Sequence, residues 1–325
     1  MRQYYVIKEE IMGFLFNGYS VITVLTFVGL VAALLLFNEI TRRSKIAAIA
    51  FYCVVPVVLI VLIALGVVSS PSSKTWFGVV KTFSALLGVL GFMAIRYTKL
   101  GEKKFAFYFP VAILAINIIE AIVRDIEVFK TYKTLTVDGA NITMLGGTWN
   151  VLNAIAGALL LVTLTGWVGI KVANTPSRDM VWADQLWFWI IAYDAWNIAY
   201  CYNCISTRSL YAGVALCVSC TIAEFCFKRG AWLQHRAQTL ALFGMFSLAV
   251  DYQAMPQFGI VASYNPSAWL ALSALALAIN AAVFAYEIYV IIKRKRNPLK
   301  QEMYTELGAY KANLKANNLM TGTKV

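Results

Sequence analysis

The chain has 325 residues, of which 60% are hydrophobic and only 14% carry a charge. Its mean hydropathy of +0.69 argues against a soluble fold, because water-soluble domains of this size are much more polar. The net charge of +12 comes from short Lys and Arg clusters between apolar segments, with no basic groove interleaved with aromatic residues. This pattern argues against nucleic acid as a partner and favours the lipid bilayer.

Nine apolar stretches are long enough to cross a membrane, which takes roughly 20 helical residues for about 30 Å of hydrocarbon. They are Met12 to Phe37, Ile46 to Ser69, Trp76 to Ile95, Phe105 to Val123, Val151 to Val172, Trp182 to Cys204, Leu210 to Phe227, Ala231 to Met255 and Ala268 to Ile292. Lone strands in lipid would leave backbone groups unpaired, so each stretch is expected to be helical. We therefore predict an all-α integral membrane protein, with a bundle of about nine transmembrane helices in residues 1–297 and a tail in residues 298–325.

Lysine and arginine residues concentrate in every second connection, which sets the expected orientation. The rich connections follow the first, third, fifth, seventh and ninth stretches, and the last of them holds Lys293 to Arg296. The positive-inside rule places these connections in the cytoplasm, so the N-terminus is expected outside and the C-terminus inside. The first stretch is too long for a signal peptide. We expect a multi-pass protein of the plasma membrane, in particular a prokaryotic inner membrane.

Two segments are expected outside the bilayer. Thr131 to Val137 alternates polar and apolar residues, Asp138 to Asn141 has turn chemistry, and Ile142 to Leu145 can return as a second strand. This pattern predicts a small external hairpin, with a plain loop as the alternative. In the tail, Gln301 to Asn317 places apolar residues on one helical face and predicts a cytoplasmic helix.

The sixth stretch has the most informative polar residues. Trp187, Asp194 and Asn197 fall on one third of the helix circumference, and Asp194 lies near the middle of the span. Tyr193 belongs to the aromatic residues that surround this aspartate. Because a mid-membrane charge costs roughly 2.5 to 3.5 kcal/mol, such a residue usually faces a polar interior. Asp194 is therefore the central candidate for binding an ion or solute.

Polar residues on other stretches could extend this site. They share the property of lying within or beside an apolar span, and they are Asn117, Glu120, Arg124, Asn153, Asp251, Asn280 and Glu287. A series of carboxylates at different depths could relay protons or coordinate a cation. Lys81 is expected to extend to the outer interface with its charge in water, with a counter-ion or covalent role as the alternative.

No cofactor or metal is expected. The run Tyr193 to Trp196 resembles the aspartate-bearing helix of microbial rhodopsins, which implies retinal on a lysine of the last helix. Ala268 to Ile292 contains no lysine, so that function is not carried over. The chain has a single histidine, and the spacing of its cysteines along two helices does not bring four sulfurs to one zinc ion. Packed apolar thiols are the preferred interpretation of the cysteines.

The leading hypothesis is a transporter or channel-like protein for a proton, a small cation or a small polar solute, with Asp194 at its centre. One alternative is a membrane sensor, similar in plan to seven-helix receptors, that binds a small ligand in the aromatic pocket around that residue. Another is a membrane enzyme acting on a lipid or quinone. An enzyme is the less favoured class, because no catalytic motif is present. The sequence leaves a homo-oligomer open.

Overall fold

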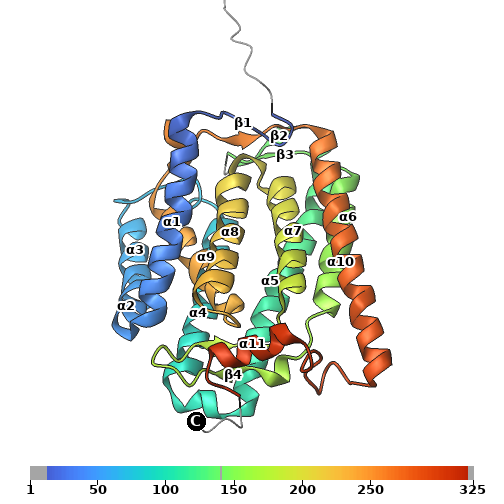
Figure 1. Cartoon of the computed structure of the whole chain (residues 1–325). Helices are drawn as coiled ribbons and strands as arrows, with labels where there is room; N and C mark the ends of the chain where they lie inside the picture. The colour runs from blue at the N-terminus through green and yellow to red at the C-terminus, as the bar shows by residue number, and fades with distance from the viewer. Residues whose placement is uncertain (1–12, 140, 321–325) are drawn as a thin grey trace, which may run out of the picture.

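The computed structural model describes residues 13–139 and 141–320, with the side chains of Trp76 and Phe77 left aside. Figure 1 shows helices packed side by side along one direction, with short strands only at the two ends of the bundle. Six helical segments of the described chain are long and apolar enough to cross a membrane. The protein is therefore a helical membrane protein, as its composition predicts.

The α-helices are α1 (Val21–Arg43), α2 (Lys45–Ile49), α3 (Val55–Ala64), α4 (Trp76–Tyr97), α5 (Tyr108–Thr131), α6 (Thr148–Val162), α7 (Trp187–Cys204), α8 (Leu216–Ile222), α9 (Trp232–Ala249), α10 (Pro266–Arg294) and α11 (Gly308–Ala316). Three π-helical segments join or extend them, and these are η1 (Ala50–Val54), η6 (Ser209–Ala215) and η7 (Ala223–Phe227). The strands form three antiparallel pairs, namely β1 (Phe16–Asn17) with β6 (Val261–Ala262), β2 (Thr136–Val137) with β3 (Thr143–Met144), and β4 (Lys171–Val172) with β5 (Met180–Val181).

The first helix begins later than its hydropathy predicts. The predicted start, Met12, lies outside the described residues, and residues 13–20 precede the helix. Ser20 caps α1, because its hydroxyl accepts from the Thr23 amide while Thr23 Oγ1 accepts from the Ser20 amide. Phe16 and Asn17 instead pair with Ala262 and Val261. The apolar run is set by composition, whereas the helix start is set by this cap.

The fifth predicted span is the largest error of boundary. Val151 to Val172 was expected to be one helix, but α6 ends at Val162 and is about 22 Å long at 1.5 Å per residue. The chain then turns at Gly166, which has a φ of +69°, a conformation that favours glycine. The remaining residues form a short 3-10 turn and strand β4. The α7 and α9 helices are also shorter than expected. The α7 helix begins at Trp187 instead of Trp182, and α9 ends at Ala249 instead of Met255.

Helices α7, α8 and α9 form the centre of the bundle. The α7 helix packs against α6 and α10, and α9 packs against α4, α8 and α1. Bulky aromatic side chains fill this centre, including the fully buried Trp196 and Trp232. Helices α1, α3 and α5 instead present many exposed apolar side chains to the surroundings. This inside-out distribution is the one expected for helices that face lipid.

The two ends of the bundle have different covers (Figure 1). At one end lie the β1–β6 pair and the predicted hairpin, in which Thr136 pairs with Met144 and Val137 with Thr143. Ala140 of its turn lies outside the described residues. At the other end lie β4 and α11. The tail helix is shorter than the predicted Gln301 to Asn317, because residues 301–307 form turns while Asp184 accepts from the Met303 and Tyr304 amides at 2.5 and 3.1 Å.

Candidate functional site

A polar cavity of about 450 Å³ enters the bundle between α4, α5, α7, η6 and α9. Its mouth includes Asp138 and Gly139 of the β2–β3 hairpin and Lys74 before α4. On α9, lining residues run from Ser247 to Arg236, a distance of about 16 Å along the helix axis. The cavity therefore extends from the hairpin end far into the bundle.

Positive charge dominates the cavity wall. The basic lining residues are Lys74, Lys81, Arg124, Arg208 and Arg236, and the acidic ones are Glu127 and Asp138. Arg124 forms an ion pair with Glu127 at 2.8 Å and lies 3.8 Å from Asp138. Arg208 donates to Ser72 Oγ at 2.5 Å. Such a wall attracts anions and repels cations.

Lys81 joins α4 to α5 within this wall. Its Nζ donates to Asn117 Oδ1 at 2.7 Å and to Glu120 Oε2 at 3.1 Å. The side chain is 20% exposed, lines the cavity and has Glu120 as its counter-ion, so the counter-ion alternative fits better than extension to the outer interface. On α5, the predicted residues Asn117, Glu120 and Arg124 all lie in or beside the cavity.

Asn197 brings α7 into the site. Its Oδ1 accepts from Arg236 Nη2 at 3.1 Å and from the Cys217 thiol at 3.4 Å. Arg236 Nε also donates to the Tyr193 hydroxyl at 3.3 Å. Tyr193, Trp189 and Trp232 pack edge to face or stacked, with ring centroids 4.7 to 5.8 Å apart. These rings are buried against one another, whereas Tyr200 of the same helix lines the cavity.

Asp194 lies apart from the cavity lining. Its Oδ2 accepts from Thr221 Oγ1 at 2.6 Å, and among the described residues Oδ1 has no hydrogen-bond partner. Trp187, predicted on the same face, is 59% exposed at the start of α7 and contacts Phe188. Asn197 and Tyr193 thus both contact Arg236. Asp194 and Trp187 do not line the cavity.

The remaining predicted residues occupy separate sites. Asn280 donates to the carbonyls of Ala192 and Ala276 at 3.1 and 2.9 Å, which joins α10 to α7. Glu287 accepts from Thr165 at 2.7 Å and from the Tyr304 hydroxyl, which fastens the tail to the bundle. Asp251 is half-buried just after α9 and does not line the cavity.

Sequence reasoning missed Asp125, a fully buried carboxylate on α5. Asn150 and the predicted Asn153 donate to it at 2.9 and 2.7 Å, and the Cys204 thiol lies 3.3 Å from Oδ1. Asp125 directly follows Arg124 in the sequence, so its side chain lies about 100° around the helix axis from the face of the predicted residue Arg124. The two asparagines, at the third and sixth positions of α6, are the available sequence signal. This cluster holds α5, α6 and α7 together.

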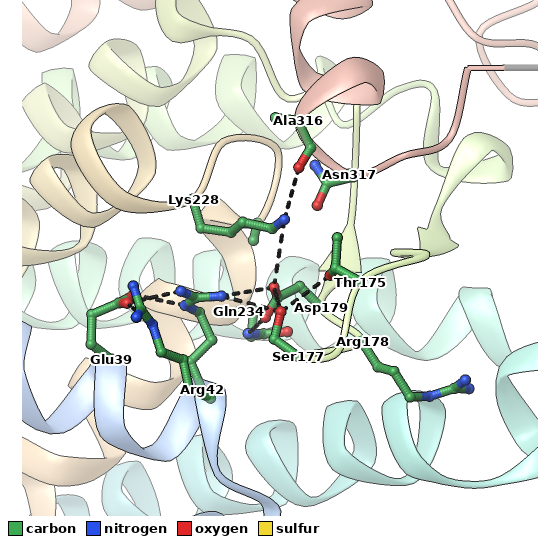
Figure 2. Close-up of polar contacts among 12 residues, drawn as sticks. Glu39, Arg42, Thr175, Ser177, Arg178, Asp179, Lys228, Gln234, Ala316 and Asn317 are labelled. Carbon is green, nitrogen blue, oxygen red and sulfur yellow. Dashed lines mark hydrogen bonds and ion pairs between the residues drawn. The ribbon is translucent and has the colours of Figure 1, made fainter. Parts of the chain in front are cut away.

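A second charged cluster closes the opposite end of the bundle (Figure 2). We call it the inner ion network, and it consists of Glu39, Arg42, Arg96, Ser177, Asp179, Lys228 and Gln234. Asp179, fully buried, accepts from Arg42 Nη1 at 2.9 Å, Ser177 Oγ at 2.6 Å and Gln234 Nε2 at 2.9 Å.

Both oxygens of the Asp179 carboxylate accept a hydrogen bond and have a positive charge nearby. Arg96 Nη2 lies 3.7 Å from Oδ1, and Lys228 Nζ lies 4.0 Å from Oδ2. Burial opposes ionisation, but the charges of Arg42 and Arg96 outweigh it, so the pKa of Asp179 lies below its usual value. The network joins α1, α4 and α9 to the β4–β5 hairpin.

The fold and the cavity define a helical membrane protein with a polar, positively charged interior. Residues 17–316 match a family of unknown function, DUF5692, and because the match covers almost the whole chain, the protein belongs to this family. No curated protein and no solved structure matches the chain.

Proposed function

We propose that the protein is a membrane transporter for a small polar solute and that the basic cavity is its binding site. The observation that carries the proposal is the polar cavity of about 450 Å³ inside a helical membrane bundle, a volume typical of small-molecule sites. Helices that face only lipid or one another need no such cavity. The wall charge favours a polar solute over the proton or cation also considered from the sequence.

The proposed topology has nine spans, with the N-terminus outside and the C-terminus in the cytoplasm. Six spans are the long apolar segments, and α6, α7 and α9 would complete the nine as shorter or more polar helices enclosed by the others. The Lys- and Arg-rich connections support a cytoplasmic position for the end that holds α11. On this topology residues 1–297 are the membrane domain, residues 298–325 are the cytoplasmic tail, and the membrane is the plasma membrane, a bacterial inner membrane in particular.

In this orientation the cavity opens outwards. The aromatic cluster of Trp189, Tyr193 and Trp232 and the inner ion network both adjoin Arg236 on the inner side, because Gln234 and Trp232 precede Arg236 by two and four residues along α9. Transport would require these two barriers to separate while the outer mouth closes, which is alternating access around a fixed site.

Solute flux tests the proposal directly. The purified protein in proteoliposomes should exchange a labelled small polar solute from a panel of anionic, neutral and cationic compounds. Ala212→Phe should block the flux, because Ala212 lines the cavity and the added ring would fill part of it. Ala112→Phe, on an exposed position of α5, is the matched control and should leave flux intact. Flux that matches that of empty liposomes for every compound would refute transport.

Thiol labelling tests the orientation. Gly139→Cys places a thiol on the exposed hairpin, and Lys311→Cys places one on the exposed face of α11. In intact cells of a variant lacking the exposed native Cys226, a membrane-impermeant reagent should label the first position and not the second. The reverse pattern would contradict the proposed topology.

A further inference from the structure

Arg236 is a buried cation with no carboxylate within ion-pair distance among the described residues, although its charge also acts on the buried Asp194 carboxylate. It is 5% exposed, and its contacts are Tyr193 Oη at 3.3 Å, Asn197 Oδ1 at 3.1 Å and the face of the Tyr193 ring at 5.7 Å. All three contacts are with neutral groups. Within residues 13–139 and 141–320, Nη1 has no hydrogen-bond partner, and no carboxylate lies within the 4.0 Å of an ion pair with this guanidinium. The guanidinium has five N–H groups, and its two hydrogen bonds to Tyr193 and Asn197 use only two of them.

Two other cations of the cavity, Lys81 and Arg124, are compensated by carboxylates of the protein itself. Lys81 has Glu120 at 3.1 Å, and Arg124 has Glu127 at 2.8 Å. An uncompensated guanidinium at membrane depth carries a desolvation penalty that the fold would normally offset with a carboxylate. At Arg236 the fold provides a cavity in place of that carboxylate.

We propose that the solute is a small anion with a carboxylate or phosphate group, and that Arg236 pairs with that group. The inference rests on the proposed function, because it places the solute in the same cavity. The planar guanidinium matches carboxylate and phosphate oxygens in a two-pronged geometry that a lysine cannot reproduce. A second unfilled polar group, the buried Tyr252 hydroxyl, also lines the cavity and has no hydrogen-bond partner in the described part of the chain.

The cavity also limits the size of the anion. Its volume of about 450 Å³ has ample room for a small organic acid or phosphate and sets an upper bound near that of a drug-sized molecule. The mouth adds Lys74 as an exposed positive charge. Positive charge at the mouth and along the wall raises the local concentration of anions and speeds their entry. The chemistry is therefore that of a short organic acid or a phosphate.

Calorimetric titration of the full chain in lipid nanodiscs tests the inference. The probes are succinate and inorganic phosphate as anions, succinamide as the neutral match of succinate, and choline as a cation. Succinate or phosphate should bind, and the arm that binds distinguishes a carboxylate from a phosphate ligand. Arg236→Gln should weaken this binding roughly ten- to hundredfold, the effect of losing a charge-assisted pair. Arg236→Lys should recover part of the affinity, because it restores the charge and not the fork.

Arg229→Gln is the matched control, since Arg229 is exposed at the other end of the bundle and should leave affinity unchanged. Thermal unfolding of each variant shows that it is folded. Preference for succinamide or choline, unchanged anion affinity in Arg236→Gln, or failure of both anions to bind the folded protein would each overturn the inference. Flux of a neutral or cationic solute in place of an anion would also overturn the inference of an anionic solute, but it would support the proposal of transport. Anion binding without any flux would leave the anion site standing and refute transport.

Discussion

Two neighbouring residues of α9, Gln234 and Arg236, belong to opposite electrostatic environments. Gln234 contributes to the inner ion network, where a buried carboxylate is surrounded by donors and cations of the protein. Arg236 lines the cavity, where a buried guanidinium has hydrogen bonds to neutral groups and no carboxylate within ion-pair distance in the described part of the chain. Satisfied charges hold helices together, whereas an unsatisfied charge beside a cavity is available to a ligand. The comparison separates a cluster that stabilises the fold from one that is expected to bind.

The largest effect is expected in the inner ion network. Asp179→Asn removes the anion shared by Arg42, Arg96 and Lys228, and leaves three cations without it. Breaking a buried pair in this way costs about 3 to 5 kcal/mol of stability. Unfolding in detergent, followed by intrinsic fluorescence, measures the loss. A change under about 1 kcal/mol would mean that the network does not stabilise the protein.

Acid should weaken the same cluster. Because the pKa of Asp179 is lower in the folded protein than in the unfolded chain, its contribution is present above the unfolded value of about 4 and is lost as pH falls through the folded value. The wild type should therefore lose stability in this range more steeply than Asp179→Asn. Melting temperatures of both proteins between neutral pH and about pH 3 test this. Parallel curves would contradict it.

The opposite behaviour is expected at the cavity. Arg236→Met removes a cation that has no carboxylate partner, so stability should change by less than about 1 kcal/mol or rise. Binding should nevertheless be lost. The same unfolding measurement compares this variant with Asp179→Asn. A loss as large as that of Asp179→Asn would erase the distinction between the two clusters.

The smallest effect is expected on the surface. Glu306 pairs with Arg294 and Arg296, but its side chain is 47% exposed. Water screens such pairs, so Glu306→Gln should cost less than about 1 kcal/mol. Unfolding at low and high salt gives the measurement, and a larger, salt-insensitive loss would show that these pairs are part of the buried framework.

The helical membrane fold follows from the sequence because hydropathy reports burial in lipid directly. Boundaries are less well predicted where a local feature starts a helix later, or ends it earlier, than the apolar run does. Ser20 delays the start of α1, and the chain turns at Gly166 soon after α6 ends. The β2–β3 hairpin was predicted correctly, because its turn and alternation are local signals.

The candidate site was predicted only in part, because helical periodicity gives the face of a residue but not the neighbour of that face. The stripe of Asn117, Glu120 and Arg124 does lie at the cavity. Asp194 shares a helix with Asn197 yet bonds Thr221 away from the cavity. The most informative residue, Arg236, lies near the start of the apolar stretch Ala231 to Met255. A basic residue at that position is usually interpreted as a signal of membrane topology. Only the packing of α9 against α4 and α8 shows that it points inwards.

The tail helix α11 determines how much water reaches the inner ion network. Lys228 Nζ donates to the Ala316 carbonyl at 2.9 Å, and Asn317 bonds both Arg229 and Asn174 through its side chain and its carbonyl. The turn at Ala316 and Asn317 thereby lies against Lys228 of the network and helps to keep the local permittivity low. The attraction among those charges is stronger where water is excluded. The turn after α11 therefore strengthens the ion pair between Arg42 of α1 and Asp179.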